Sequence, residues 1–323
     1  MAGRGDAPLP SGVVTSDSFP PIRRLGPGDL RRCVALSVDR GWSPERAKWA
    51  LLLECSEAFG VDAPDEAVPR GGRLAGAVVL TRWGPDLASV GMMLVATRYA
   101  RRGLGRALME HLLAEAGDAT VTLFATDLGR PLYEKLGFAS VRQSVSFVGT
   151  FRSGPAVPGG RAGLGVPAAR PGQTGPGGPA ECVRPATDAD LPSILAVDRA
   201  AFGADRGRVL SRLPGFAERM AVLENGQGID GYAAAWRNLP SSAIIGPVVA
   251  PDADAAKRLI MDLAATVTGN VRLDLNPDRP ELPAWAHAHG LQPVSRTILM
   301  AHGELADRGQ PDRLFTPISV ALA

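Results

Sequence analysis

The chain repeats itself on either side of a segment that has no apolar pattern. Ile22–Leu30 is similar to Val183–Leu191, and Leu136-Gly137-Phe138 is matched by His289-Gly290-Leu291. In each copy a short strand leads to an aspartate that can cap a helix, and the later triplet leads into an alternating strand. The predicted architecture is therefore two copies of one α/β unit in tandem.

The segment between the copies, residues 150–181, consists mainly of glycine, proline, alanine and arginine. Such a segment buries too little apolar surface to offset its ordering entropy, which predicts a flexible linker. The domain organisation that follows is a disordered tail over 1–20, a first domain over 21–149, the linker, a second domain over 182–305 and a C-terminal tail over 306–323. Two domains of about 150 residues also suit the length of the chain.

Hydrophobic periodicity predicts a mixed α/β fold in both copies. In the first copy the pattern predicts helices over 104–116 and 130–136 and strands over 74–80, 89–95, 120–125 and 142–148. In the second copy it predicts helices over 188–201, 252–267 and 280–289 and strands over 229–236, 243–249, 271–275 and 295–300.

One strand of the first copy runs into a basic, glycine-containing turn that opens a helix. The turn consists of Arg101, Arg102, Gly103, Leu104, Gly105 and Arg106. Amides at a helix N-terminus lack intrahelical acceptors, and the helix dipole favours negative charge there. Glycine has no Cβ, so a ligand can approach the backbone closely. These residues predict an anion-binding site just ahead of Leu104.

Composition excludes several other classes of function. The formal net charge is only +2, which argues against a nucleic-acid partner. The three cysteines are far apart and have no metal-ligand spacing, so we expect no metal and a reducing, cytoplasmic location. No apolar run is long enough to span a bilayer, so we expect no membrane partner.

A second segment, residues 123–138, strengthens the interpretation of the basic turn. It predicts a strand, a loop and a helix that ends in Tyr133, Gly137 and Phe138. Together the two segments resemble the cofactor half of the GNAT superfamily of acyl-CoA-dependent N-acyltransferases, which carries a pyrophosphate loop followed by a Tyr-x-x-x-Gly-Phe helix. The resemblance implies two tandem GNAT-like domains and acetyl-CoA as the co-substrate.

The resemblance also implies roles for individual residues. Tyr133 would be the catalytic acid that protonates the leaving thiolate. Ala100 and Thr126 depart from the family, which usually has Arg or Gln at the first position and often Asn at the second. The implied cofactor-binding residues are Leu94, Val95, Ala96, Arg101, Arg102, Gly103, Leu104, Gly105, Arg106, Thr126 and Gly129.

The second copy lacks the features that would bind a coenzyme. Where the first copy has its glycine turn, the second has Asp252 and Asp254, and Ala286 stands at the position of Tyr133. Carboxylates at a helix N-terminus suit ordinary capping and would repel a diphosphate. The second copy resembles the non-catalytic second domain of tandem GNAT proteins, so we predict a degenerate domain.

The acceptor is less defined by the sequence. Glu54 and Glu57, expected on a helix near Trp42 and Trp49, and Asp274, expected at a strand end, are candidates for contact with an amine. The competing interpretation is a solvated helix face for the two glutamates and a capping or turn carboxylate for Asp274. A water chain is an alternative general base.

The predicted function is an acetyl-CoA-dependent N-acetyltransferase that acts on a primary amine of a small molecule by direct attack. Two alternatives remain at this stage: a non-catalytic acyl-CoA-binding sensor or scaffold, and an acetyltransferase similar to mycothiol synthase. A homodimer is compatible with the sequence.

Overall fold

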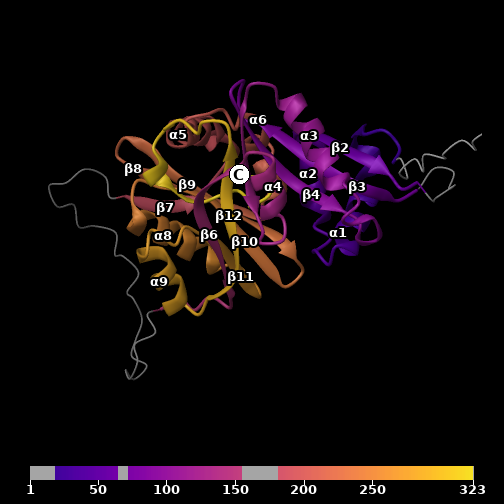
Figure 1. The fold of residues 1–323 in the computed structure, drawn as a ribbon. Coiled ribbons are helices and arrows are strands. Elements are labelled where there is room, and N and C mark those ends of the chain that lie inside the picture. The colour runs from indigo at the N-terminus through magenta and orange to yellow at the C-terminus, as the bar shows by residue number, and fades with distance from the viewer. Residues whose placement is uncertain (1–18, 65–71, 155–180, 323) are drawn as a thin grey trace, which may run out of the picture.

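The computed structural model describes residues 19–64, 72–154 and 181–322. Two α/β halves lie side by side, and β6 and β12 run along their boundary (Figure 1). The helices of the first half are α1 (Leu30–Asp39), α2 (Arg46–Cys55), α3 (Leu104–Ala116) and α4 (Arg130–Lys135). Its strands are β1 (Arg23–Leu25), β2 (Glu57–Asp62), β3 (Leu74–Arg82), β4 (Leu87–Val95), β5 (Thr120–Ala125) and β6 (Ala139–Gly149).

The second half repeats this order. Its helices are α5 (Leu191–Phe202), α6 (Gly207–Leu210), α7 (Leu213–Phe216), α8 (Ala253–Ala264) and α9 (Glu281–Ala288). Its strands are β7 (Cys182–Pro185), β8 (Arg219–Asn225), β9 (Gly228–Leu239), β10 (Ser242–Val249), β11 (Asn270–Leu275), β12 (Gln292–His302) and β13 (Leu314–Thr316). The predicted mixed α/β class and the tandem arrangement are confirmed.

The halves exchange their long C-terminal strands and so share one 13-stranded sheet in the order β1-β2-β3-β4-β5-β12-β6-β11-β10-β9-β8-β7, with β13 beside β10. β12 of the second half pairs with β5 of the first, and β6 of the first half pairs with β11 of the second. Ser144 lies opposite Thr297, and these residues follow Gly137 and Gly290 by the same seven positions. The halves are therefore related by an approximate two-fold rotation about this pair.

Apolar residues cross the boundary between the halves. Trp83 packs edge-on against Phe202 of α5 at 6.1 Å between ring centroids, and the Asp205 amide donates to the Trp83 carbonyl oxygen at 3.1 Å. Trp83 and α5 belong to one buried cluster that also includes Ile318 and Leu322. Residues 315–322, which lie in the predicted C-terminal tail, are thus largely buried and contribute to the core.

Two further observations bear on the sequence-based expectations. Glu57 lies at the start of β2, so its predicted place on a helix is wrong; α2 ends at Cys55 because the chain turns extended at Ser56. The tail and linker predictions lie largely outside the described residues, which exclude 1–18 and 155–180. Among the described residues, no helix is long and apolar enough to cross a membrane.

Candidate active site

An opening in the sheet of the first half begins at Gly91. β4 and β5 are parallel partners from Leu87 with Thr120 to Val90 with Leu123, and no pair follows. Met92 has a left-handed φ of +50°, which kinks β4 at that point. No other described strand pairs with the end of β4 on the β5 side.

The register of β3 and β4 decides which backbone groups face this opening. The Ala96 amide donates to the Ala75 carbonyl oxygen at 2.8 Å, and Leu94 lies opposite Ala77 of β3. Backbone groups of successive strand residues point to opposite sides. The N–H and C=O of Val95 therefore face the opening, whereas the predicted use of the Ala96 amide conflicts with its bond to β3.

The N-terminus of α3 lies directly beyond this end of β4. Gly103 precedes the helix with φ +81°, a conformation that favours glycine. The Ala107 amide donates to the Gly103 carbonyl oxygen at 3.0 Å, so the amides of Leu104, Gly105 and Arg106 have no acceptor one turn earlier in the helix. A Cβ on Gly105 would lie 3.0 Å from Cε of Met93, so this glycine lets α3 pack closely on β4.

Positive charge surrounds these amides. Arg101, Arg102 and Arg106 are exposed. The Arg102 guanidinium lies 5.2 Å from the centre of the Phe19 ring, and Arg106 forms an exposed ion pair with Glu110 at 2.7 Å. The helix N-terminus and the arginines together favour an anion.

Tyr133 lies on α4, the helix that follows β5. Its side chain is buried, and burial raises the pKa of its hydroxyl to about 12. Its ring lies 5.8 Å from the ring of Phe138, and a Cβ on Gly129 would lie 3.0 Å from Cε2 of Tyr133. Gly129 thus leaves space for the tyrosine ring.

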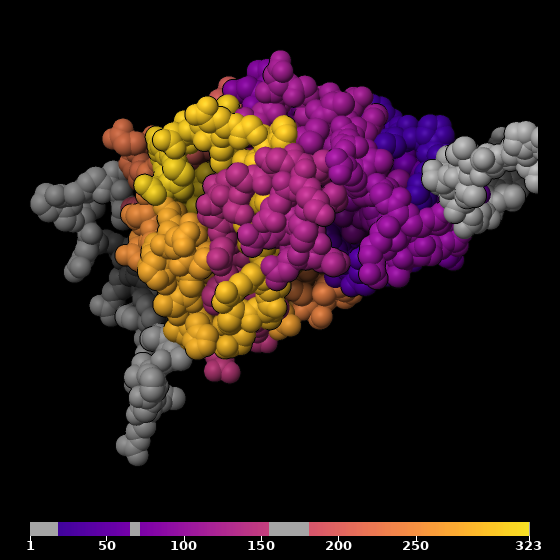
Figure 2. Space-filling view, viewed as in Figure 1, coloured from indigo at the N-terminus to yellow at the C-terminus, as the bar shows by residue number. Residues whose placement is uncertain are grey.

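Thr126 makes a side-chain hydrogen bond to the backbone of the loop that precedes α4. Its hydroxyl accepts from the Gly129 amide at 3.3 Å, just before α4 begins. The space-filling view shows a hollow between the magenta surface around α4 and the purple surface beside it (Figure 2).

The equivalent opening in the second half is closed by the chain itself. β10 pairs with β11 only from Ser242 to Ile244. β13 then pairs with β10, with Thr316 opposite Val248 and Leu314 opposite Val249.

A hydrogen bond to the residue just before β13 fills the place that stays open in the first half. Gly76 lies close to the Leu94 carbonyl oxygen, and Gly231 lies close to the Val249 carbonyl oxygen in the same way, so Leu94 and Val249 are equivalent. The residues that follow them, Val95 and Ala250, are therefore equivalent too. The Ala250 amide donates to the Arg313 carbonyl oxygen at 3.0 Å. The backbone of residue 313 thus satisfies the amide whose counterpart in the first half faces the opening.

The helix after β10 also differs from α3. The Asp252 carboxylate accepts from the Ala255 amide at 2.8 Å, which confirms the predicted capping role. The equivalence of Ala286 with Tyr133 is confirmed as well, because their carbonyl oxygens accept from the Leu291 and Phe138 amides, both at 3.0 Å. At the equivalent positions the second half thus has a capped helix N-terminus in place of that of α3 and an alanine in place of Tyr133.

The three acceptor candidates do not come together. Glu54 pairs with Arg212 across the two halves at 2.7 Å. Glu57 pairs with Arg24 at 2.6 Å and Arg82 at 2.7 Å. These partners give both glutamates structural roles.

Asp274 is buried in β11 on the far side of β6 and β12 from β5. Its Oδ1 accepts from Ser146 at 2.6 Å and Arg272 at 2.9 Å. Sequence reasoning missed Gly91 and β13, since a lone glycine and a three-residue strand give no periodic signal.

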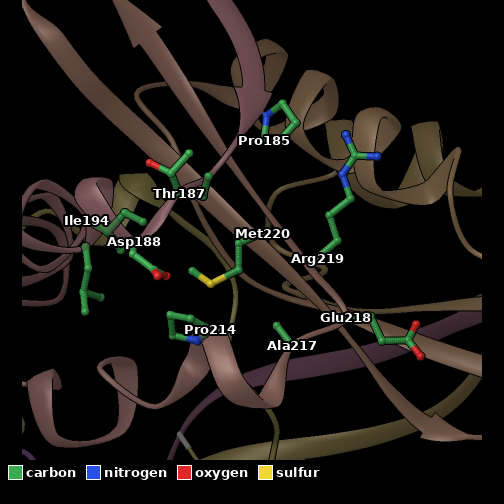
Figure 3. A pocket seen from close by; sticks show the side chains of 11 residues that line it. Pro185, Thr187, Asp188, Ile194, Pro214, Ala217, Glu218, Arg219 and Met220 are labelled. Carbon is green, nitrogen blue, oxygen red and sulfur yellow. The ribbon is translucent and has the colours of Figure 1, made fainter.

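A cavity of about 280 Å³ lies in the second half between the start of α5 and β8. Arg219 and Glu218 point away from Met220 at its centre (Figure 3) and pair with Asp262 and Arg237. A cavity of about 380 Å³ in the first half is lined by Ala96, Arg98 and Tyr99 together with α1 and the start of β3. In the described part of the chain no three His, Cys, Asp or Glu residues form a metal-binding group.

Comparisons with known proteins agree with this arrangement. Residues 67–150 and 194–316 each match a family model described as an acetyltransferase (GNAT) domain, and together the matches cover more than half of the chain. The chain belongs to the GNAT acetyltransferase family.

One curated relative is an uncharacterized N-acetyltransferase, YitH, of Bacillus subtilis (strain 168). It is 29% identical over 203 residues, which cover 61% of this chain and 63% of the relative's length.

Two solved structures share the fold. A proposed acetyltransferase from Pyrococcus horikoshii has a TM-score of 0.72 at 19% identity, covering 94% of this chain and 95% of that chain. A tandem GNAT protein from the clavulanic acid biosynthesis pathway has a TM-score of 0.56 at 18% identity, covering 88% of this chain and 99% of that chain. The tandem arrangement is therefore one that solved GNAT structures also have.

Proposed function

We propose that the chain is an acetyl-CoA-dependent N-acetyltransferase whose coenzyme site and chemistry lie in the first half. The observation that supports this assignment best is the difference between the two openings. Val95 presents its N–H and C=O to an opening that no described strand fills, whereas the equivalent Ala250 amide is bonded to Arg313.

The residues of the first half suit each part of the coenzyme. The amides of Leu104, Gly105 and Arg106 would hold the diphosphate at the N-terminus of α3. The backbone of Val95 would bond the pantetheine arm or the thioester oxygen. Gly103 and Gly105 allow the diphosphate to approach the main chain.

The reaction is a direct attack on the thioester. The lone pair of a neutral primary amine forms a bond to the carbonyl carbon, and the carbon–sulfur bond then breaks. The Tyr133 hydroxyl gives its proton to the departing thiolate; with its pKa raised by burial to about 12, this hydroxyl is protonated at neutral pH. We assign the amine's proton to water, since Glu54 and Glu57 are engaged by arginines.

Thiol release from acetyl-CoA tests the proposal. With a panel of small primary amines the chain should release CoA, and Tyr133→Phe should slow release without loss of coenzyme binding. Tight binding of CoA with no turnover across the panel would contradict an enzyme and favour a coenzyme-responsive scaffold.

A further inference from the structure

The residues after β13 run from the closed opening of the second half to the first half. The Pro317 carbonyl oxygen lies against Gly246 of β10, and the Ala321 carbonyl oxygen lies against Gly91 of β4, so a Cβ on either glycine would overlap it. The two glycines are equivalent, because Gly91 and Gly246 each lie four residues before the equivalent pair Val95 and Ala250.

This crossing requires a strongly curved sheet. β4 and β10 are five strand spacings apart along the sheet, which would be about 24 Å if the sheet were flat. Residues 317 and 321 can span at most about 14 Å when fully extended, and the bond from the Leu322 amide to the Ser319 carbonyl oxygen folds this stretch into a turn, which shortens it further. The sheet therefore bends so that β4 and β10 approach each other across the segment, and the last described residues lie between the two halves (Figure 1).

The segment is firmly held in this position. The indole N–H of Trp236 donates to the Ile318 carbonyl oxygen at 3.2 Å. The Leu322 amide donates to the Ser319 carbonyl oxygen at 2.8 Å, and the Ala321 amide donates to the Ser319 hydroxyl at 3.2 Å. Ile318 and Leu322 are buried. A segment with these contacts forms a fixed wall.

The wall lies at the point where the opening in the first half begins. Gly91 directly follows the last β4–β5 pair and precedes the kink at Met92. It shares a face of β4 with Ser89, whose hydroxyl accepts from the indole of Trp83 at 3.0 Å. Beyond the kink, Met93 and Val95 instead face α3 through Gly105. The Ala321 wall therefore covers the inner end of the opening from the face away from α3.

We propose that residues 318–322 form the acceptor-side wall of the active centre in the first half, and that Ala321 limits the size of the amine that reaches the thioester. This inference rests on the proposed function: a coenzyme with its diphosphate at α3 and its arm along the end of β4 directs its sulfur toward Gly91. The second half thus supplies a specificity-determining residue to the first.

Thiol–disulfide exchange with CoA disulfide tests whether Ala321 lies near the sulfur of the bound coenzyme, and it requires no known acceptor amine. The background carries Cys182→Ser, because Cys182 is exposed. Cys33 and Cys55 are buried and are present in every variant, so their reaction contributes equally to the rates that are compared. Ala321→Cys places a thiol at the wall, and Thr316→Cys is the matched variant, because Thr316 is similarly buried and lies on β13 in the closed opening.

In the exchange, the introduced thiolate attacks one sulfur of the CoA disulfide, the sulfur–sulfur bond breaks, and one CoA leaves as a thiolate that takes a proton from water. Ala321→Cys should gain one CoA per chain at least about 10-fold faster than Thr316→Cys. Excess desulfo-CoA should suppress the difference. Equal rates of exchange, or no protection by desulfo-CoA, would contradict the position of Ala321 beside the coenzyme sulfur.

Amine selectivity gives the second readout. Ala321→Val should lower kcat/KM for bulky amines such as tryptamine by at least about 10-fold relative to ethanolamine, while the Kd for CoA stays within about two-fold. Ala265→Val is the control, because it makes the same change at an exposed residue at the end of α8, outside the wall. An equal change for all amines would contradict a role for Ala321. If the unaltered chain does not bind CoA, the proposed function itself is contradicted. If it binds CoA but Ala321→Cys is not labelled and Ala321→Val does not change the amine selectivity, only the proposed wall is contradicted.

Discussion

Both halves have an opening between two parallel strands; it stays open in the first half and is filled by the chain itself in the second. In the first half β4 leaves β5 at Gly91 and the Val95 backbone faces the opening. In the second half β13 enters at the equivalent place, and Arg313 accepts the Ala250 amide. A parted pair of strands therefore does not by itself make a coenzyme site, because the chain can satisfy the exposed backbone with its own strand.

The helix that follows each opening shows the same contrast. Before α3 the chain makes a basic turn that ends at Gly103, and the first amides of the helix stay available. Before α8 only Ala250, Pro251 and Asp252 intervene, and the Asp252 carboxylate takes the Ala255 amide. The second half has filled with its own atoms both places that a coenzyme would use.

The largest effect is expected from charge at the N-terminus of α3. Gly103→Glu places a carboxylate beside the unpaired amides, where it caps the helix and repels a diphosphate. The Kd for CoA should rise by at least about 100-fold, or about 2.7 kcal/mol, as measured by isothermal titration calorimetry.

Gly117→Glu is the matched control for this change. Gly117 ends the same helix with φ +64°, and like Gly103 it has open space where a Cβ would lie. Both variants carry the same charge, and the backbone cost at Gly117, whose ψ is −130° against −9° at Gly103, is at least as large as at Gly103. Equal losses of CoA affinity would show that charge or stability, rather than the anion site, causes the effect.

The next effect concerns the Tyr133 phenol, whose equivalent position in the second half is Ala286. Tyr133→Phe removes the proposed acid and should lower kcat by about 100-fold, within the range typical of general acids, while the Kd for CoA changes little. An unchanged kcat would remove Tyr133 from the chemistry.

The pH profile tests the same group independently. Because burial raises the pKa of Tyr133 from its usual value of 10 to about 12, the acidic form persists below that pH and is lost above it. The kcat of the unaltered chain should therefore show no fall caused by this group between pH 8 and pH 10. A decline centred near pH 10 that is absent from Tyr133→Phe would contradict the raised pKa.

A smaller effect is expected from loosening β13. Phe315 is buried, and Arg279 lies over its ring at 5.1 Å. Phe315→Ala should lower the free energy of unfolding by about 3 kcal/mol through loss of packing, measured by urea denaturation. The stoichiometry of CoA should stay at one per chain, since Asp252 and Asp254 still repel a diphosphate; a second equivalent of bound CoA would mean that β13 alone closes the site.

The smallest effect is at the cap of α8. Asp252→Ala removes an N-cap and should cost about 1 kcal/mol of stability, again from urea denaturation. Its affinity for CoA should equal that of the unaltered chain. A gain in affinity would place the coenzyme in the second half.

Much of this contrast is predictable from the residues. The helix over 104–116 and the strand over 120–125 have the predicted bounds, because long apolar periodicity and glycine stops are strong local signals. Asp252 and Ala286 indicated a degenerate second copy because capping and the Tyr-x-x-x-Gly-Phe pattern are local too. The roles of individual residues in binding and catalysis stay predictions.

The exchange of β6 and β12 could not be predicted in the same way. The two strands are repeats of each other, so β5 finds an equivalent partner in either, and tertiary context decides which one pairs. The insertion of β13 depends on a three-residue strand, which has no periodicity to detect. The wall at Gly91 depends on contacts between residues about 230 positions apart.

A crystal structure of the full chain with CoA tests the central comparison most directly. We expect one coenzyme per chain, with its diphosphate on the amides of Leu104, Gly105 and Arg106 and its arm beside Val95, while the Ala250 amide stays bonded to Arg313. A diphosphate at the N-terminus of α8 with β13 displaced would contradict the account.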